Sequence, residues 1–255
     1  GTTDELILAG QSTVQNSAGL LARSVDDLRL VLDVLAGPVE PVAVAGLGVG
    51  VYEHDGLFAP SPAIRRAVRE AAAALAERGA RMREFTPPGV AEAIELFETL
   101  FRADGGAHLR ELLGASERDF RIEQTLAGMS VSEVSPGAVA AYQARFAAAL
   151  AASGIEALVC PPLGFPAPRH GTSVALRPGQ SYGALFNLLG MPAGTVAASR
   201  VQPGEEEPRE IDRASAGLPV GVQVAAPHGR EDIVLGVMSA LEDALGEQDG
   251  YPVLF

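Results

Sequence analysis

Lysine and tryptophan are absent from this sequence of 255 residues, and cysteine occurs once. Arginine therefore supplies all 19 positive charges, and 32 acidic residues leave a formal net charge of −13. A nucleic-acid partner is not expected, because binding phosphates requires a basic face that this composition does not provide. Cys160 alone cannot form an internal disulfide, so nothing in the sequence favours an oxidising compartment.

Long apolar segments are missing as well. No uninterrupted apolar run approaches the roughly 18 residues of a membrane-spanning helix, and no charged start followed by a short apolar core indicates a signal peptide. A cytoplasmic protein with no transmembrane segment is therefore expected. A chain of 255 residues is long enough to bury a sizeable core, and we expect a single domain over residues 1–255.

Apolar periodicity and capping residues predict a largely helical middle region. Ser24, Ser61 and Ser181 each stand at the expected N-cap of a helix, just before an apolar stripe. Further helices are expected over residues 88–113, 137–153 and 234–246. Short apolar segments predict strands over residues 47–52, 157–160, 193–198 and 218–224. The strand over 193–198 consists of small apolar residues and is expected to be buried on both faces.

Two features invite a functional reading that their context does not support. The glycines at 46, 48 and 50 lack the final glycine of a nucleotide-binding loop and lie inside a predicted strand, so close packing is the better account. Glu205, Glu206 and Glu207 lie between two predicted strands and are expected to form a solvated surface insertion. The four histidines show no metal-ligand spacing, so no metal or other cofactor is expected.

Several segments, in this order along the chain, resemble the amidase signature family, and within it the fatty acid amide hydrolase-like branch. Residues 19–28 read G-L-L-A-R-S-V-D-D-L, with Leu21 where relatives usually carry proline. Residues 181–196 read S-Y-x-x-L-F-N-x-L-x-x-P-A-G-x-V, and residues 217–223 read G-L-P-V-x-V-Q. The resemblance implies an α/β fold in which a mixed sheet is covered by helices, as in the C-terminal part of the amidase signature fold.

Hydrolysis of a carbon–nitrogen bond is the activity that the resemblance implies. Enzymes of this family use a nucleophilic serine, a second serine and a lysine base, with backbone N–H groups holding the oxyanion. This sequence has no lysine and no Gly-Gly-Ser-Ser-Gly-Gly-like loop. No catalytic residue is therefore expected in this chain, and the Ser-Ser-Lys residues are expected in an upstream segment or in a partner chain.

The part of the family that this chain resembles contributes to the acyl-binding wall. The resemblance therefore implies a small-molecule amide substrate, a primary or N-substituted carboxamide with an apolar acyl group. Candidate substrate-lining residues are Tyr182, Phe186 and Met191, together with His170 in the proline-rich loop 161–180. Tyr182 and Phe186 also share a helical stripe, a pattern that is more often core than pocket.

Two alternatives stay open at this point. A free-standing half-amidase that no longer hydrolyses amides could act as a binding or scaffold protein, or use the remaining cleft for other chemistry. Because half of a sheet exposes an edge, such a chain is also expected to associate with a partner or as a homo-oligomer. The second alternative is an α/β-hydrolase, since Gly179 to Gly183 fits G-x-S-x-G around Ser181 and is followed by Asp212 and His228. Its context is poor, because no strand leads into Gly179.

Overall fold

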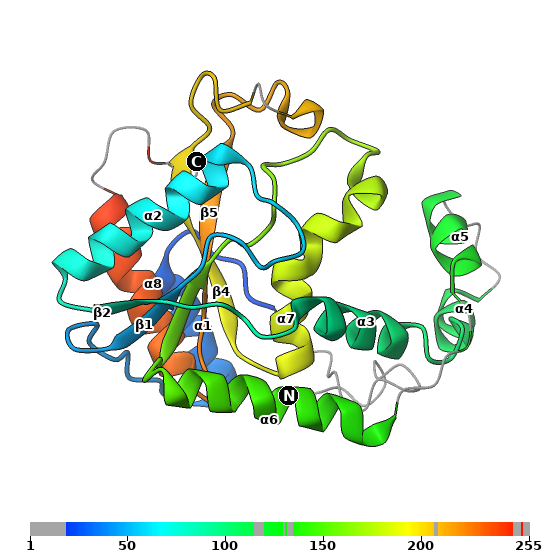
Figure 1. The fold of residues 1–255 in the computed structure, drawn as a ribbon, viewed down its shortest axis with the longest axis horizontal. Coiled ribbons are helices and arrows are strands. Elements are labelled where there is room, and N and C mark those ends of the chain that lie inside the picture. Colours follow the sequence, from blue (N-terminus) through cyan, green and yellow to red (C-terminus); the bar gives the residue numbers. More distant parts are fainter. Residues whose placement is uncertain are drawn as a thin grey trace.

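A computed structural model describes residues 19–114, 120–129, 131, 135–206, 209–246 and 251. Within them, five strands form one sheet with helices on both faces (Figure 1). The strands are β1 (Gly48–Val51), β2 (Arg81–Glu84), β3 (Ala157–Cys160), β4 (Ala193–Arg200) and β5 (Pro219–Ala225). This arrangement confirms the predicted α/β fold with a mixed, helix-covered sheet.

Eight α-helices occur in the described residues. They are α1 (Val25–Ala36), α2 (Pro62–Glu77), α3 (Val90–Phe101), α4 (Ala107–Leu113), α5 (Phe120–Ala127), α6 (Pro136–Ala152), α7 (Ser181–Leu189) and α8 (Glu231–Leu245). Two 3₁₀ helices, Ser173–Gln180 and Glu210–Asp212, lie in the longer connections. None of the helices in the described ranges has the length and apolar character needed to cross a bilayer.

The sheet has the strand order β2-β1-β3-β5-β4 and changes direction in the middle. β1 pairs in parallel with β2 and with β3, whereas β5 pairs antiparallel with β3 and with β4. Parallel neighbours require a crossover, and α2 provides it between β1 and β2 while α3 to α6 lie between β2 and β3. β2 and β4 are the two edge strands.

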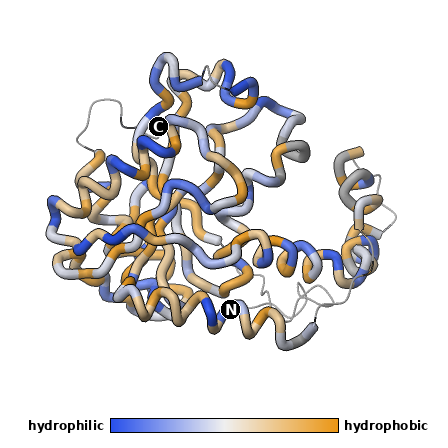
Figure 2. Tube along the Cα trace, in the orientation of Figure 1, coloured by the Kyte–Doolittle hydropathy of each residue, from blue (hydrophilic) through white to orange (hydrophobic). Residues whose placement is uncertain are grey.

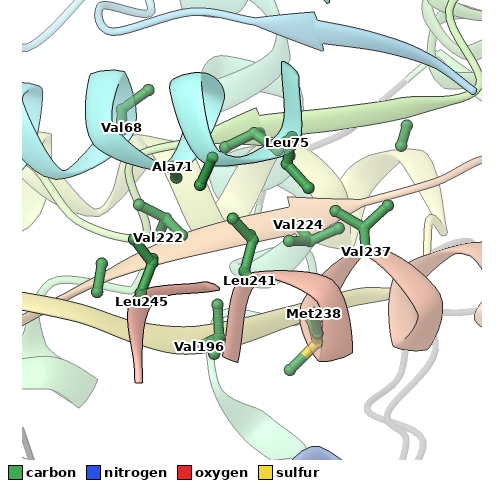
Figure 3. Close-up of a cluster of buried hydrophobic side chains, with 14 of the residues drawn as sticks. Val68, Ala71, Leu75, Val196, Val222, Val224, Val237, Met238, Leu241 and Leu245 are labelled. Atoms are coloured by element: carbon green, nitrogen blue, oxygen red, sulfur yellow. The ribbon is translucent and has the colours of Figure 1, made fainter. Parts of the chain in front are cut away.

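One face of the sheet is covered by α2 and α8. Their small and branched side chains meet alternate residues of the strands in a continuous core, part of which Figure 3 shows. The labelled residues are Val68, Ala71, Leu75, Val196, Val222, Val224, Val237, Met238, Leu241 and Leu245. α1 packs onto α8, and the Val25 N–H donates to both carboxylate oxygens of Glu242 at 3.0 and 3.3 Å. The predicted apolar stripe of the last helix is confirmed.

The opposite face is covered by α3, α6 and α7. Its core is richer in aromatic residues and includes Tyr142, Phe146, Tyr182 and Phe186, all with at most 2% exposure. Figure 2 shows how hydrophilic residues gather outside these layers, for example in the connection from β4 to β5. The sequence predicts that Glu205, in that connection, is solvated, and this prediction is wrong. Glu205 binds Arg66 of α2 at 2.7 Å, with only 16% of its side chain exposed; Glu207 lies outside the described residues.

Two sequence expectations about helices need correction. The segment 88–113 is not one helix but α3 and α4, separated by Gly105 and Gly106, which both have positive φ. Ser61 precedes α2 as expected, but its side chain makes no capping hydrogen bond. Ser24 does cap α1, because its Oγ accepts from the Asp27 N–H at 3.1 Å.

The strand over 193–198 is also not buried on both faces. Val196 and Ala198 are buried against α8, whereas Ala193 and Thr195 are exposed on the other side. Gly48 and Gly50 of β1 serve close packing, since a Cβ at Gly48 would overlap the carbonyl of Gly154. The glycine spacing in β1 is therefore a packing feature and not a nucleotide loop.

Candidate functional site

Three loops that are distant in sequence meet just before α7. The Gly164 N–H donates to the Gly179 carbonyl at 2.9 Å and closes the loop 161–180. Arg209 lies in the connection from β4 to β5 and joins it to the two other loops, because its guanidinium donates to the carbonyls of Ala59 at 2.5 Å and Gly164 at 3.1 Å. The same guanidinium lies over the Phe58 ring, 5.4 Å from its centroid. These contacts hold the three loops together beside the start of α7.

A buried carboxylate, Asp55, organises the polar contacts at the start of α7. Asp55 is 4% exposed, and its Oδ1 accepts from the N–H groups of Leu57 at 2.9 Å and Phe58 at 3.0 Å. Its Oδ2 accepts a short hydrogen bond from the Ser181 hydroxyl. The Tyr182 hydroxyl donates to the Phe58 carbonyl at 2.7 Å. These bonds hold the turn after β1 against the first residues of α7.

Behind Ser181, a second set of buried groups extends into the core. Gln223 of β5 donates to the Tyr182 carbonyl at 3.3 Å and contacts the Cys160 sulfur at 3.6 Å. Burial raises the pKa of the Cys160 thiol to about 12. Burial, together with Cys160, also raises the pKa of Tyr52, whose ring stacks on Tyr182. Cys160 is completely buried in this core, as the sequence predicts.

The structure does not assemble the triad of the α/β-hydrolase alternative. Ser181 bonds to Asp55, whereas Asp212 pairs with Arg209 at 2.7 Å. His228 is exposed, and its Nδ1 lies 2.9 Å from the Gly190 carbonyl. A 3₁₀ helix, not a strand, leads into Ser181, which is the first residue of α7 and not its N-cap. The elbow of this alternative is therefore absent from this segment, and so is the serine cap that the sequence predicts.

A small cavity adjoins the start of α7. It has a volume of about 200 Å³ and lies between α3 and α7. Phe97, Phe101 and Arg102 line it on one side, and Ser181 and Ala184 line it on the other. Ser181 is only 2% exposed and its hydroxyl is bonded to Asp55, so that hydroxyl is not free to bind a ligand in the cavity.

A larger cavity of about 780 Å³ lies between α6, the C-terminal part of α7 and the start of α8. Its apolar lining includes Phe146, Leu150, Ile155, Phe186 and Met191. Asn187, His228 and Glu231 also line it and add polar groups. An apolar wall with a few polar groups is typical of sites that bind small organic molecules.

The four predicted substrate-lining residues fall into two groups. Phe186 and Met191 line the larger cavity. Tyr182 is completely buried in the core, and His170 is exposed in the loop, so neither lines one of the two cavities described. Contact of these four residues with substrate stays a prediction, which we carry forward for Phe186 and Met191.

The sequence does not predict the residues that hold the site together through contacts with segments far away along the chain. Asp55 is followed by glycine in a turn, a signal for loop structure but not for a buried carboxylate. Arg209 and Gln143 act through backbone carbonyls, and Gln143 donates to the Leu188 carbonyl at 2.8 Å. Among the described residues, no three histidine, cysteine or acidic side chains form a group that could hold a metal ion.

Comparison with known proteins places the chain in a family. Residues 3–235 match the family model described as Amidase, so the chain belongs to the amidase family. It is 30% identical over 246 residues to fatty acid amide hydrolase 1 of Caenorhabditis elegans, covering 78% of this chain and 43% of that protein. It is 30% identical over 264 residues to 6-aminohexanoate-cyclic-dimer hydrolase of Paenarthrobacter ureafaciens, covering 89% and 53%.

Solved structures agree with this assignment at the level of the fold. A fatty acid amide hydrolase matches with a TM-score of 0.73 and 23% identity, covering 93% of this chain and 49% of that chain. A 6-aminohexanoate cyclic dimer hydrolase matches with a TM-score of 0.65 and 23% identity, covering 88% and 54%. The resemblance seen in the sequence is confirmed. The chain spans about half the length of these relatives.

Proposed function

We propose that this chain is part of an amide hydrolase of the amidase signature type. It supplies a single domain of sheet and covering helices over residues 1–255 and part of the acyl-binding wall. The catalytic Ser-Ser-Lys residues lie in a segment outside it, either on the same chain or on a partner chain. The match of residues 3–235 to the amidase family is the observation that carries this proposal.

The proposed chemistry needs a group that this chain does not have. A neutral, buried lysine takes the proton of the nucleophilic serine through a second serine, and backbone N–H groups stabilise the oxyanion. No lysine occurs among the 255 residues. The buried Cys160 thiol does not replace it, because burial raises its pKa to about 12.

The larger cavity supports an apolar acyl group as the part of the substrate that this chain contacts. The half-buried Met191 and Phe186, which is only 2% exposed, line a cavity of about 780 Å³, a volume in the range of small-molecule sites. The proposed substrate is a primary or N-substituted carboxamide. The cytoplasmic setting expected from the lone Cys160 is part of the same proposal.

Native mass spectrometry of the protein purified from its own source tests the location of the catalytic residues. We expect amide hydrolysis to co-purify with a species that contains both this sequence and a lysine-bearing amidase segment. Hydrolysis by a lone 26.3 kDa species would contradict the proposal, because that species has no base of the required kind. A lone, inactive species that binds amides would favour the half-amidase alternative.

Substitution in the cavity tests the acyl wall in the active preparation. Replacing Met191→Ala removes apolar contact, so KM for a long-chain amide should rise about tenfold while KM for acetamide stays unchanged. Met129→Ala is the matched control, since Met129 lies beside Gly106 and away from the cavity. Equal effects of the two substitutions, or equal effects on both substrates, would argue against an acyl site here.

A further inference from the structure

The hydrogen bonds of Arg209 go beyond a single ion pair. Its guanidinium donates to both carboxylate oxygens of Asp212, at 2.7 and 3.0 Å, and also to the carbonyls of Ala59 and Gly164. Asp212 is 1% exposed, so its charge is removed from water and needs a partner. The guanidinium can bond one carboxylate and two carbonyls at once, because its five N–H groups form a planar, rigid fork.

Phe58 is enclosed by Arg209 and the loop 161–180. The guanidinium lies over its ring, and the Phe165 ring meets it edge-to-face, with the centroids 5.9 Å apart. A Cβ at Gly164 would approach the Phe58 ring to 2.2 Å, and a Cβ at Gly179 would approach the Phe165 ring to 2.3 Å. The two glycines therefore leave the space that the rings fill, and the surrounding groups fix the position of Phe58.

The backbone of Phe58 connects this cluster to α7. Its N–H donates to Oδ1 of Asp55 at 3.0 Å, and its carbonyl accepts from the Tyr182 hydroxyl at 2.7 Å. Tyr182 is the second residue of α7 and is completely buried. The Phe58 carbonyl is therefore a direct contact between the cluster around Arg209 and the start of α7.

The position of α7 affects both cavities. The first residues of the helix line the small cavity and its C-terminal part lines the larger one. Gln143 holds the C-terminal part through the Leu188 carbonyl. The helix has only nine residues, about two and a half turns, so a displacement of its start would tilt it as one body. Such a tilt would move Phe186 in the wall of the larger cavity.

We propose that Arg209 is a positioning residue of the amide-binding site. By holding Phe58 against the loop 161–180, it fixes the start of α7 and thereby the wall that α7 presents to the larger cavity. This inference rests on the proposed function, because the larger cavity is the proposed site of the acyl group. Arg209 itself lines neither of the two cavities, so it acts on substrate binding only through Phe58 and α7.

A purely local role for Arg209 makes a different prediction. Asp212 is three residues away, and the ion pair spans the 3₁₀ helix Glu210–Asp212. If Arg209 only neutralised Asp212, any positive charge would suffice, and lysine would replace it. Bridging Asp212, Ala59 and Gly164 instead requires the guanidinium fork, which lysine does not have. Arg209→Lys therefore separates the two roles.

Three variants are compared with the wild type in the active preparation. Arg209→Lys keeps the charge and removes the fork. The double variant Arg209→Met with Asp212→Asn removes the ion pair without leaving a buried carboxylate unpaired, so that the loss of Arg209 does not unfold the chain. Arg66→Lys is the matched control. Arg66 also pairs with an acid of the β4–β5 connection, Glu205, and donates to the Arg200 carbonyl, each at 2.7 Å, but it joins that connection to α2.

Hydrogen–deuterium exchange and steady-state kinetics are the two measurements. In Arg209→Lys and in the double variant, peptides over residues 52–61 and 161–181 should exchange about tenfold faster, while β5 and α8 keep the wild-type rate, because only local contacts open. KM for a long-chain amide should rise about tenfold with kcat unchanged, as expected when binding common to the ground state and the transition state is lost. Arg66→Lys should change neither the local exchange nor KM.

The inference is overturned if Arg209→Lys matches the wild type in local exchange, because charge alone then suffices. It is overturned as well if local exchange rises while KM stays within about twofold of the wild type, or if β5 and α8 exchange faster to the same extent as the loops. If no protein of the series hydrolyses amides, wild type included, the proposed function is refuted. The Kd of the same amide then replaces KM, with the same expected rise and the same result against the inference.

Discussion

Ser181 and Ser61 are both buried, yet they should respond in opposite ways to substitution by alanine. The Ser181 hydroxyl donates to the carboxylate of Asp55, which is 4% exposed. A hydrogen bond to a charged group contributes about 1.5–3 kcal/mol, and its removal leaves Oδ2 without that donor. Ser181→Ala should therefore lower the free energy of unfolding by about 2–3 kcal/mol.

The Ser61 hydroxyl has no hydrogen-bond partner among the described residues and is completely buried. Burying an unbonded hydroxyl costs about 1–3 kcal/mol, so its removal should not destabilise the protein. We expect Ser61→Ala to leave the free energy of unfolding unchanged or to raise it by up to about 1 kcal/mol. If Ser61 instead capped α2, as the sequence predicts, the same substitution would cost about 1 kcal/mol.

Urea denaturation followed by far-UV circular dichroism measures these differences. Ser215→Ala is an intermediate control, because the Ser215 hydroxyl is buried and donates to a neutral carbonyl, that of Asp212, at 2.5 Å; it should cost about 1 kcal/mol. The reasoning is refuted if Ser181→Ala lies within about 0.5 kcal/mol of the wild type, or if Ser61→Ala is the more destabilising of the two. The hydrolytic rate should not depend on Ser181, since the structure assembles no triad around it.

Three further predictions follow from buried contacts. Arg66→Ala should lower the free energy of unfolding by about 2–3 kcal/mol, because it leaves the half-buried Glu205 unpaired. Burial raises the pKa of Glu205, but hydrogen bonds from Arg66 outweigh it and hold the pKa below 4.5. The ion pair therefore stabilises the fold at neutral pH, and the difference between variant and wild type should shrink as the pH falls below that value in urea titrations. Gly48→Ala should destabilise the protein by about 3 kcal/mol or more, because the added Cβ would overlap the Gly154 carbonyl. Gly183→Ala places its Cβ in open space on α7 and should stabilise the protein by about 0.5–1 kcal/mol. Thermal melts that rank the two variants otherwise would contradict the packing described. Cys160, with a pKa raised to about 12, should react with iodoacetamide at least about 100-fold more slowly in the folded than in the unfolded protein, and rapid labelling of the folded chain would show that the thiol is accessible.

The sequence predicts where the helices and strands lie along the chain better than it predicts which of their faces are covered. Apolar stripes locate α8, and short apolar runs locate β1, β3 and β5, because burial against a sheet requires those patterns. β2 was missed, since a charged edge strand such as Arg81–Glu84 has no apolar alternation. The apolar run in β4 gave no indication that one of its faces is uncovered, because exposure depends on neighbours that a local pattern does not contain.

The candidate site was predictable only in part. Phe186 and Met191 were found because they lie in a segment that the family resemblance marks, and both line the larger cavity. Asp55 was not found, because its role depends on Ser181, which is 126 residues away in sequence. Ser181 itself is predicted to cap a helix because an apolar stripe follows it in sequence. Contacts between distant residues decide such roles, and one sequence without its tertiary partners does not specify them.

The change of strand direction in the middle of the sheet has a consequence for the order of folding. β4 and β5 are joined by residues 201–218, whereas β1 and β3 are joined by residues 52–156. The second connection is about six times longer, and closing it costs about 1.6 kcal/mol more in chain entropy. The antiparallel pair and the following α8 are also contiguous in sequence, so they can form first as a nucleus onto which the parallel strands assemble. Pulse-labelling hydrogen exchange should therefore protect β5 before β1.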